Sequence, residues 1–232
     1  MSRISWLNQM RGLCVPKKTE MINIKEIENN PQKSLVERYI LGLKTAYIKR
    51  GCKEKWDNFE KVAEGASEDN LRRIKELYPG VPASLIELLS YIDGTYHRKY
   101  KEEKICLYFL GSRLKEYPYY LLSSGRMIEN ENLASEDYSD YVNREFDPDD
   151  IPVDDRIIDD TSEMRWLHFS DCMNNGGTSQ LFIDFSPSPS GKVGQVVMTL
   201  HDSDRIDVIA DSFDEYLEKM MDKDFDFICE AS

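Results

Sequence analysis

The chain has 232 residues, of which 41% are hydrophobic and 11% aromatic, and its formal net charge is −13. This length and apolar content are enough for a folded core, and they exclude a disordered chain. The acidic balance argues against nucleic acid as a partner, because phosphate binding needs a basic surface. A basic protein is a better match, since complementary charge speeds encounter; the alternative is that the acidic excess only keeps the protein in solution.

The cellular compartment is predicted from the cysteines and from the distribution of apolar residues. The five cysteines are scattered without a Cys-x-x-Cys pair, which suits a reducing compartment. Residues 1–16 contain Arg3 and Arg11 among their apolar positions, so they do not form the apolar core of a signal peptide. Apolar runs also stay well short of the roughly 20 residues that a membrane span needs. We therefore predict a cytoplasmic protein that does not bind membranes.

Residues 1–66 predict a helical extension. Ser34 and Glu37 have capping-box spacing, and Gly51 ends the helix that they open. Apolar residues recur at helical spacing in this helix, at Leu35, Tyr39, Leu43 and Tyr47. A shorter apolar face around Trp56 and Phe59 follows, and packing explains these aromatics better than a cofactor does. The extension could cover the rest of the fold, form a dimer contact or belong to a second module.

Two further helices and two strands are predicted next. Ser67 caps a helix that ends at Pro79–Gly80, and a second helix follows Pro82 and closes at Asp93–Gly94. The apolar runs 105–110 and 119–123 predict buried strands. Residues 129–163 then hold 14 Asp and Glu against Arg144 and Arg156, with few aliphatic residues. We predict that this acidic stretch is a long surface loop that could include one short helical turn.

The last third of the chain predicts an antiparallel sheet and a closing helix. Four strand-like runs are joined by short connections rich in turn formers, at 166–169, 180–185, 195–200 and 206–210. Strands joined in this way pair mainly antiparallel. Ser212 and Glu215 form another capping-box pattern and open the closing helix. We therefore predict an α+β fold with a mainly antiparallel sheet backed by helices.

Several of these segments together are similar to one known family. Ile74 to Gly94 consists of a helix, a proline turn and a second helix that leads to Asp-Gly. Further similar positions follow along the chain, at 120–123, Trp166-Leu-His-Phe169, Asp184, Gly191, Gly194-Gln-Val196, His201-Asp202 and 210–217. This ensemble resembles the SUKH superfamily, which includes the Smi/Knr cell-wall-assembly regulators. The resemblance covers about residues 67–220. We predict a SUKH-like domain over 67–232 and a helical extension of unknown role over 1–66.

The resemblance implies a binding role. Bacterial members look like immunity proteins, which bind and neutralise toxin domains that are often nucleases, and eukaryotic members resemble regulatory scaffolds. No shared catalytic set is implied. The departures from the family pattern are the extension before Ser67 and the long acidic insert before Trp166, and these parts leave the toxin class open.

The motifs of common enzymes are not found in the sequence. It has neither a Gly-x-Ser-x-Gly elbow nor a phosphate-binding Gly-x-x-x-x-Gly-Lys loop. His168, Asp171, His201 and Asp202 could converge as a metal site, but their spacing does not support one. Asn174 to Gly177 predicts a tight turn. We predict that the protein is not an enzyme and has no cofactor.

The leading hypothesis is an immunity-type protein whose acidic surface covers the basic face of a toxin domain; the alternative is a regulatory scaffold. Tyrosines among the acids are candidate anchors, because Tyr is favoured at interface centres. The predicted partner-binding residues are Glu136, Asp137, Tyr138, Asp140, Tyr141, Asp147, Asp149 and Asp150.

Overall fold

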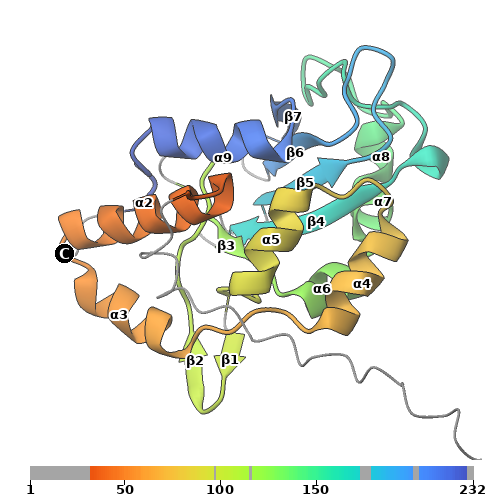
Figure 1. Cartoon of the computed structure of the whole chain (residues 1–232). Helices are drawn as coiled ribbons and strands as arrows, with labels where there is room; N and C mark the ends of the chain where they lie inside the picture. Colours follow the sequence, from red (N-terminus) through yellow and green to blue (C-terminus); the bar gives the residue numbers. More distant parts are fainter. Residues whose placement is uncertain (1–31, 97, 115–116, 173–178, 201–203, 229–232) are drawn as a thin grey trace, which may run out of the picture.

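The computed structural model describes residues 32–96, 98–114, 117–172, 179–200 and 204–228 (Figure 1). The helices are α2 (Leu35–Lys49), α3 (Lys53–Val62), α4 (Glu68–Leu77), α5 (Ala83–Tyr91), α6 (Ser124–Glu129), α7 (Leu133–Asp137), α8 (Ser139–Val142), the 3-10 turn η1 (Thr161–Glu163) and α9 (Phe213–Asp222). The strands are β1 (Arg98–Tyr100), β2 (Glu103–Ile105), β3 (Tyr120–Leu121), β4 (Trp166–Cys172), β5 (Ser179–Asp184), β6 (Gln195–Leu200) and β7 (Arg205–Ala210).

The sheet topology confirms the predicted α+β fold. The main sheet has the order β3-β4-β5-β6-β7, and every neighbouring pair is antiparallel. Sequence neighbours therefore pair in space, as short connections require. β1 and β2 form a separate antiparallel hairpin that projects from the molecule (Figure 1). The four strands predicted over 166–210 all lie in the main sheet.

Helix starts follow the capping signals in the sequence. The Ser34 hydroxyl accepts a hydrogen bond from the Glu37 amide, and the Glu37 carboxylate accepts one from the Ser34 amide, which completes the capping box. Ser67 accepts from Asn70 at the start of α4. Ser212 caps α9 in the same way, but the carboxylate of Glu215 accepts from the amide of Asp211 instead of that of Ser212.

The larger hydrophobic core lies between one face of the sheet and helices α2, α5 and α9. It includes fully buried side chains from α2 and α3, such as Tyr39 and Trp56, together with Phe169 of β4 and Phe213 of α9. The rings of Phe169 and Phe213 meet edge to face, with 5.5 Å between their centroids. Helices α2 and α3 thus cover this side of the fold. The domain boundary at residue 66 stays a prediction. The larger core contains residues from both sides of that position.

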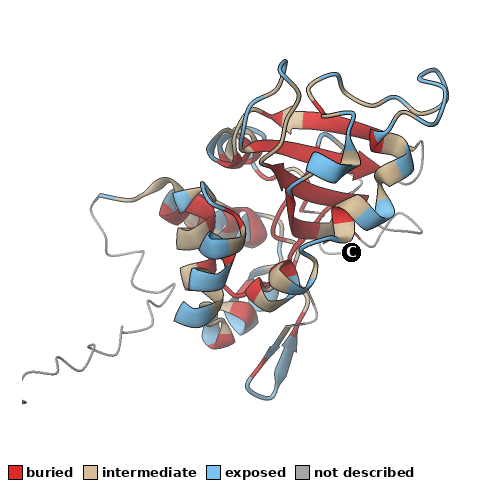
Figure 2. Cartoon of the chain, turned by 90° about the vertical axis from the view of Figure 1, so that its right-hand side faces the viewer, coloured by how far each residue is buried: buried red, intermediate tan, exposed pale blue. Residues whose placement is uncertain are grey.

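The prediction of a loop for the acidic stretch is wrong in part. Residues 133–163 contain α7, α8 and η1, and they cover the second face of the sheet. Ala134, Val142 and Ile157 of this stretch are buried against Phe182 and Val197 of the sheet. The sheet is therefore buried on both faces, and Figure 2 shows its strands mostly in the buried colour. A few apolar residues suffice here, because the sheet supplies the other half of each contact. We call residues 129–163 the acidic layer.

The prediction of a strand over 105–110 is also wrong for most of its length. β2 includes only Ile105 of this run, and Leu110 makes an isolated bridge to Tyr119. The run is buried, but tyrosine hydroxyls take the place of a neighbouring strand: those of Tyr39 and Tyr47 each donate to a carbonyl of the run at 2.7 Å. The second predicted strand, 119–123, shortens to the two residues of β3, because Ser123 caps α6.

Several residues that carried the family resemblance form the connection between β5 and β6. The Gln195 side chain donates to the Asp184 carboxylate at 2.9 Å and to the Arg156 carbonyl at 3.0 Å. A Cβ on Gly191 would lie 2.5 Å from that carbonyl, and Gly194 has φ +90°. These positions thus build a turn. The predicted turn at Asn174–Gly177 lies outside the described residues.

Among the described residues, α2 is the longest helix, and none of the helices is both long and apolar enough to cross a membrane.

Candidate binding surface

His168 shows how the candidate metal ligands are placed. Its Nε2 lies 2.9 Å from the Asp171 carboxylate and 3.1 Å from the Ser170 carbonyl, and its Nδ1 lies 2.9 Å from the Asn130 amide nitrogen. The ring is 1% exposed and stacks on Phe182. His168 therefore has structural hydrogen bonds at both nitrogens. His201 and Asp202 lie outside the described residues. Among the described residues, no group of three or more His, Cys, Asp or Glu side chains is placed to hold a metal ion.

The six predicted carboxylates lie on the acidic layer and face solvent. Glu136 and Asp137 belong to α7 and Asp140 to α8, whereas Asp147, Asp149 and Asp150 lie in the loop that follows. All six are exposed, and in the described part of the chain none has a Lys or Arg partner within ion-pair distance. We call this set the exposed carboxylates.

The two arginines of the acidic layer are used to hold it together. Arg144 donates to the carbonyls of Val142 and Ile157 at 2.9 and 3.1 Å. Arg156 binds the Asp154 carboxylate and donates to the Val208 carbonyl of β7 at 3.0 Å. Burial favours the protonated form of Asp154, but the hydrogen bonds from Arg156 and from the Val208 amide outweigh it and lower the pKa of that carboxyl to about 2. Both arginines of the layer thus bind carbonyls or Asp154, and they do not pair with the exposed carboxylates.

The two predicted tyrosines have different roles. Tyr138 is half-buried: its hydroxyl donates to the Gln180 side chain at 2.7 Å and lies 2.9 Å from the Thr199 hydroxyl, so it fastens the layer to β5 and β6. Tyr141 packs against Tyr138 and Phe146, with ring centroids 6.0 and 5.2 Å apart. Burial and the nearby carboxylates of Asp204 and Asp140 raise the pKa of Tyr141. Tyr138 thus belongs to the contact with the sheet, whereas Tyr141 lies beside the exposed Phe146.

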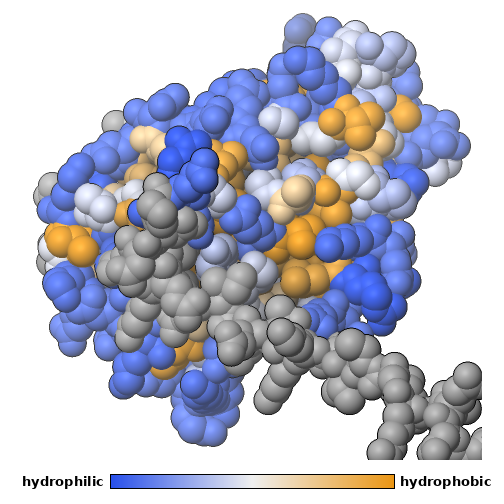
Figure 3. Space-filling model, viewed as in Figure 1, coloured by the Kyte–Doolittle hydropathy of each residue, from blue (hydrophilic) through white to orange (hydrophobic). Residues whose placement is uncertain are grey.

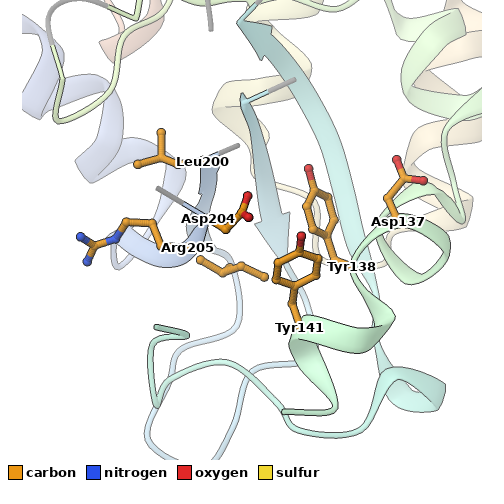
Figure 4. Close-up of a pocket in the computed structure, with 7 residues that line it drawn as sticks. Asp137, Tyr138, Tyr141, Leu200, Asp204 and Arg205 are labelled. Atoms are coloured by element: carbon orange, nitrogen blue, oxygen red, sulfur yellow. The ribbon is translucent and has the colours of Figure 1, made fainter. Parts of the chain in front are cut away.

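A small pocket forms where the acidic layer meets the β6–β7 edge of the sheet (Figure 4). Its volume is about 160 Å³, and it brings part of the predicted set together with residues from the sheet. The residues that line it are Asp137, Tyr138, Tyr141, Leu200, Asp204, Arg205 and Ile206. We call it the tyrosine pocket. The remaining predicted residues, Glu136, Asp140, Asp147, Asp149 and Asp150, lie outside it.

A second, smaller hollow of about 100 Å³ lies next to the tyrosine pocket and shares Tyr141 with it. Phe146, Pro148 and Ile151 line this hollow, and Phe146 is 43% exposed. The acidic layer therefore offers apolar contact as well as charge. Figure 3 shows this end of the molecule, at the upper right, as mainly hydrophilic surface with a smaller hydrophobic patch.

A larger cavity, which reaches the acidic layer only at Glu129, was not predicted. It measures about 450 Å³ and is lined by Tyr96, Leu122 and Ser123 together with the basic residues Arg98, Lys99 and Arg126. Each of these bases pairs with an acid of its own neighbourhood, Asp93, Glu102 and Glu129 respectively. The cavity thus has less unbalanced charge than the acidic layer.

The sequence did not point to Asp204, Arg205, Leu200 and Ile206, which β6 and β7 bring to the tyrosine pocket. They lie about sixty residues beyond Tyr141, and only the pairing of β6 with β7 places them there. Phe146 was missed as well, although its position among unbroken polar residues was a signal in the sequence.

Comparison with family models identifies a family. The model of the SMI1 / KNR4 family (SUKH-1) matches residues 65–219. This range runs from just before α4 into α9, and it includes the main sheet and the acidic layer. A search of curated proteins finds no match.

Proposed function

The chain belongs to the SMI1 / KNR4 family (SUKH-1), and from this membership we propose that it is a non-catalytic, immunity-type protein. In this proposal the protein binds a basic toxin domain through the acidic layer and blocks the surface with which the toxin engages its own substrate. A nuclease domain fits best, because its substrate-binding face must be basic to hold phosphates.

The observation that supports this proposal most is the state of the exposed carboxylates. Carboxylates that stabilise a fold are paired or hydrogen-bonded, as Asp93 is with Arg98 at 2.7 Å and Asp154 with Arg156 at 2.6 Å. The six on the acidic layer have no ion pairs among the described residues. Two of them accept hydrogen bonds within the layer: Asp147 from the Asp149 amide at 3.0 Å, and Asp140 from the Ser139 hydroxyl at 3.2 Å. The six carboxylates repel one another, and a basic partner would relieve that repulsion.

The way the layer is built also supports a binding role. It is fastened to the sheet by Tyr138, Arg144 and Arg156 and by its own buried apolar residues. A surface held in place before the partner arrives loses less conformational entropy on binding. The layer therefore resembles a prepared interface more than a solvated flap.

The experiment that tests the proposal is affinity co-purification of the tagged protein from its native cells at low salt, with the bound proteins identified by mass spectrometry. We expect one stoichiometric basic protein with a toxin-like domain, whose activity falls when this chain is added. A large housekeeping assembly, without protection against any toxin, would instead support a regulatory scaffold. Recovery of no partner at low salt would count against both binding roles.

A further inference from the structure

The tyrosine pocket combines aromatic rings, carboxylates and an apolar floor. Tyr138 and Tyr141 stand at an interplanar angle of 64°, and Leu200 and Ile206 close the pocket from the sheet. Asp137 and Asp204 also line it. Two π faces beside two carboxylates form an environment that favours a cation over a neutral or anionic group.

The aromatic wall is fixed before any ligand arrives. The Tyr138 hydroxyl is bound to Gln180 and Thr199, which are 4% and 1% exposed. Its ring also meets Phe182 edge to face at 5.8 Å. Tyr141 in turn packs between Tyr138 and Phe146. The pocket therefore needs little rearrangement to accept a side chain.

Arg205 is the basic residue among the described residues that line the pocket, and its side chain does not fill it. The guanidinium of Arg205 binds the Asp207 carboxylate, with distances of 2.9 Å from Nη2 and 2.7 Å from Nε. Asp207 is 8% exposed and also binds Arg113. Figure 4 shows the Arg205 guanidinium directed away from the two tyrosines. The positive charge of Arg205 is thus bound by Asp207 and is not directed at the two tyrosines.

We propose that the tyrosine pocket receives one arginine side chain of the partner protein, with the guanidinium against the Tyr141 ring and between the carboxylates of Asp137 and Asp204. A planar guanidinium stacks on an aromatic face and donates to two carboxylates at once, which an ammonium group cannot do equally well. A volume of about 160 Å³ suits a guanidinium and part of its stem. The proposal deepens the proposed function, because it names the group through which a basic partner would be anchored.

The test uses small probes and needs no partner. The full chain is labelled with ¹³C at the tyrosine ring carbons, and the ring signals are assigned with single Tyr→Phe variants. The probes are N-acetyl-arginine amide, N-acetyl-lysine amide and N-acetyl-citrulline amide, the last a neutral analogue of nearly the same shape as arginine. We expect the arginine probe to shift the Tyr138 and Tyr141 signals with saturable, millimolar affinity, at least about fivefold tighter than citrulline.

Tyr96 and Tyr120 provide an internal control, because their rings also lie close together, at 4.8 Å, and Tyr96 lines the cavity with the three basic residues. Their signals should stay unchanged. Equal shifts by arginine and citrulline would overturn the proposal, as would an absence of shifts. If the lysine probe bound with the same affinity as the arginine probe, the choice of arginine as the ligand would be overturned.

A double variant separates charge from shape. Asp137→Asn with Asp204→Asn should weaken the arginine probe about tenfold and leave citrulline unaffected. The matched control, Glu54→Gln with Glu218→Gln, removes two exposed charges on α3 and α9 and should change neither affinity. Unchanged arginine affinity in the first variant would contradict the pocket's role. Because no toxin is involved, such a failure would leave the immunity proposal standing, and failure to recover a partner would leave the pocket testable.

Discussion

At the scale of single residues, Tyr138 and Tyr141 separate stability from binding. Tyr138→Phe removes a hydroxyl that is bound to two buried side chains, Gln180 and Thr199, and we expect it to lower the free energy of unfolding by about 1–3 kcal/mol. Tyr141→Phe is the matched control, because within the described residues its hydroxyl makes no hydrogen bond, and it should cost under about 0.5 kcal/mol. Urea denaturation measures both. Equal costs would contradict the role of Tyr138 as the fastener of the layer.

Asp184 gives the fold a dependence on pH. It is 0% exposed, and burial raises the pKa of its carboxyl to about 6 despite hydrogen bonds from Ser186 and Gln195. A raised pKa means that the folded protein binds the proton more tightly than the unfolded chain. The stabilisation by this group is therefore complete below about pH 4 and lost as the pH rises through about 6.

The variant Asp184→Asn isolates this effect, because it keeps the size of the side chain and cannot ionise. We expect the wild-type protein to lose on the order of 2 to 3 kcal/mol relative to the variant between pH 4 and pH 8. The measurement is the difference in unfolding free energy across that range. A difference that does not vary with pH would show that Asp184 titrates near its ordinary pKa.

At the scale of elements, the turn between β5 and β6 depends on glycine. A Cβ on Gly191 would approach the Arg156 carbonyl oxygen to 2.5 Å and the Gln195 side chain to 2.9 Å. Since the carbonyl belongs to the backbone and cannot move aside, Gly191→Ala should destabilise the protein by about 2 kcal/mol or more. Gly125→Ala is the control, because its Cβ would meet nothing nearer than 4.0 Å. If thermal unfolding placed both variants at the wild-type midpoint, the close packing of this turn would be wrong.

The acidic layer is an element that depends on a few apolar contacts. Ile157 is 2% exposed and packs in the second core with Phe182 and Val208. Ile157→Ala should cost about 2–4 kcal/mol and speed amide exchange in residues 133–163. Ile48→Ala, at a position that is 43% exposed, should change neither by much. If the amides of residues 133–163 exchanged as fast in the wild type as in the Ile157 variant, the layer would be a mobile loop.

The sequence predicted the strands over 166–210 better than it predicted the acidic layer or the run 105–110. The strands from Trp166 to Ala210 are short, mainly apolar runs between strong turn formers, a pattern that favours buried strands. The helices of the acidic layer were missed because they are only five and four residues long and carry many polar residues, although Ala134, Tyr138 and Val142 have helical spacing. The run 105–110 was taken for a strand because burial alone does not reveal that Tyr39 and Tyr47 satisfy its carbonyls.

The candidate site was predictable only where it is local in the sequence. The exposed carboxylates and Tyr141 follow one another within fifteen residues and are visible as a charge run. Asp204 and Arg205 reach the same pocket through strand pairing. The guanidinium of Arg205 points away from the pocket because it binds Asp207. Such contacts arise from tertiary structure, so composition and spacing do not contain them.

At the scale of the whole molecule, the charge is unevenly distributed. Residues 1–128 hold 23 Lys and Arg against 16 Asp and Glu, whereas residues 129–163 hold 14 acids against two bases. Residues 202–232, which include α9, are also acidic, with 11 acids against three bases. The fold places helices α2 to α5 on one side and the acidic layer on the other face of the sheet (Figure 1). A basic partner would therefore be steered toward the acidic layer, and the steering should weaken with salt.

The most direct test of binding through the acidic layer is the affinity of a charge-reversed variant for the co-purified partner. Glu136, Asp137, Asp140 and Asp149 are changed to Lys, and the matched control reverses Glu54, Glu103, Glu218 and Asp222, which are exposed elsewhere. At about 50 mM NaCl we expect the first variant to bind at least about thirtyfold more weakly, and the control to bind nearly as the wild type does. The difference should shrink at about 300 mM NaCl. Equal affinities of the two variants would contradict binding through the acidic layer.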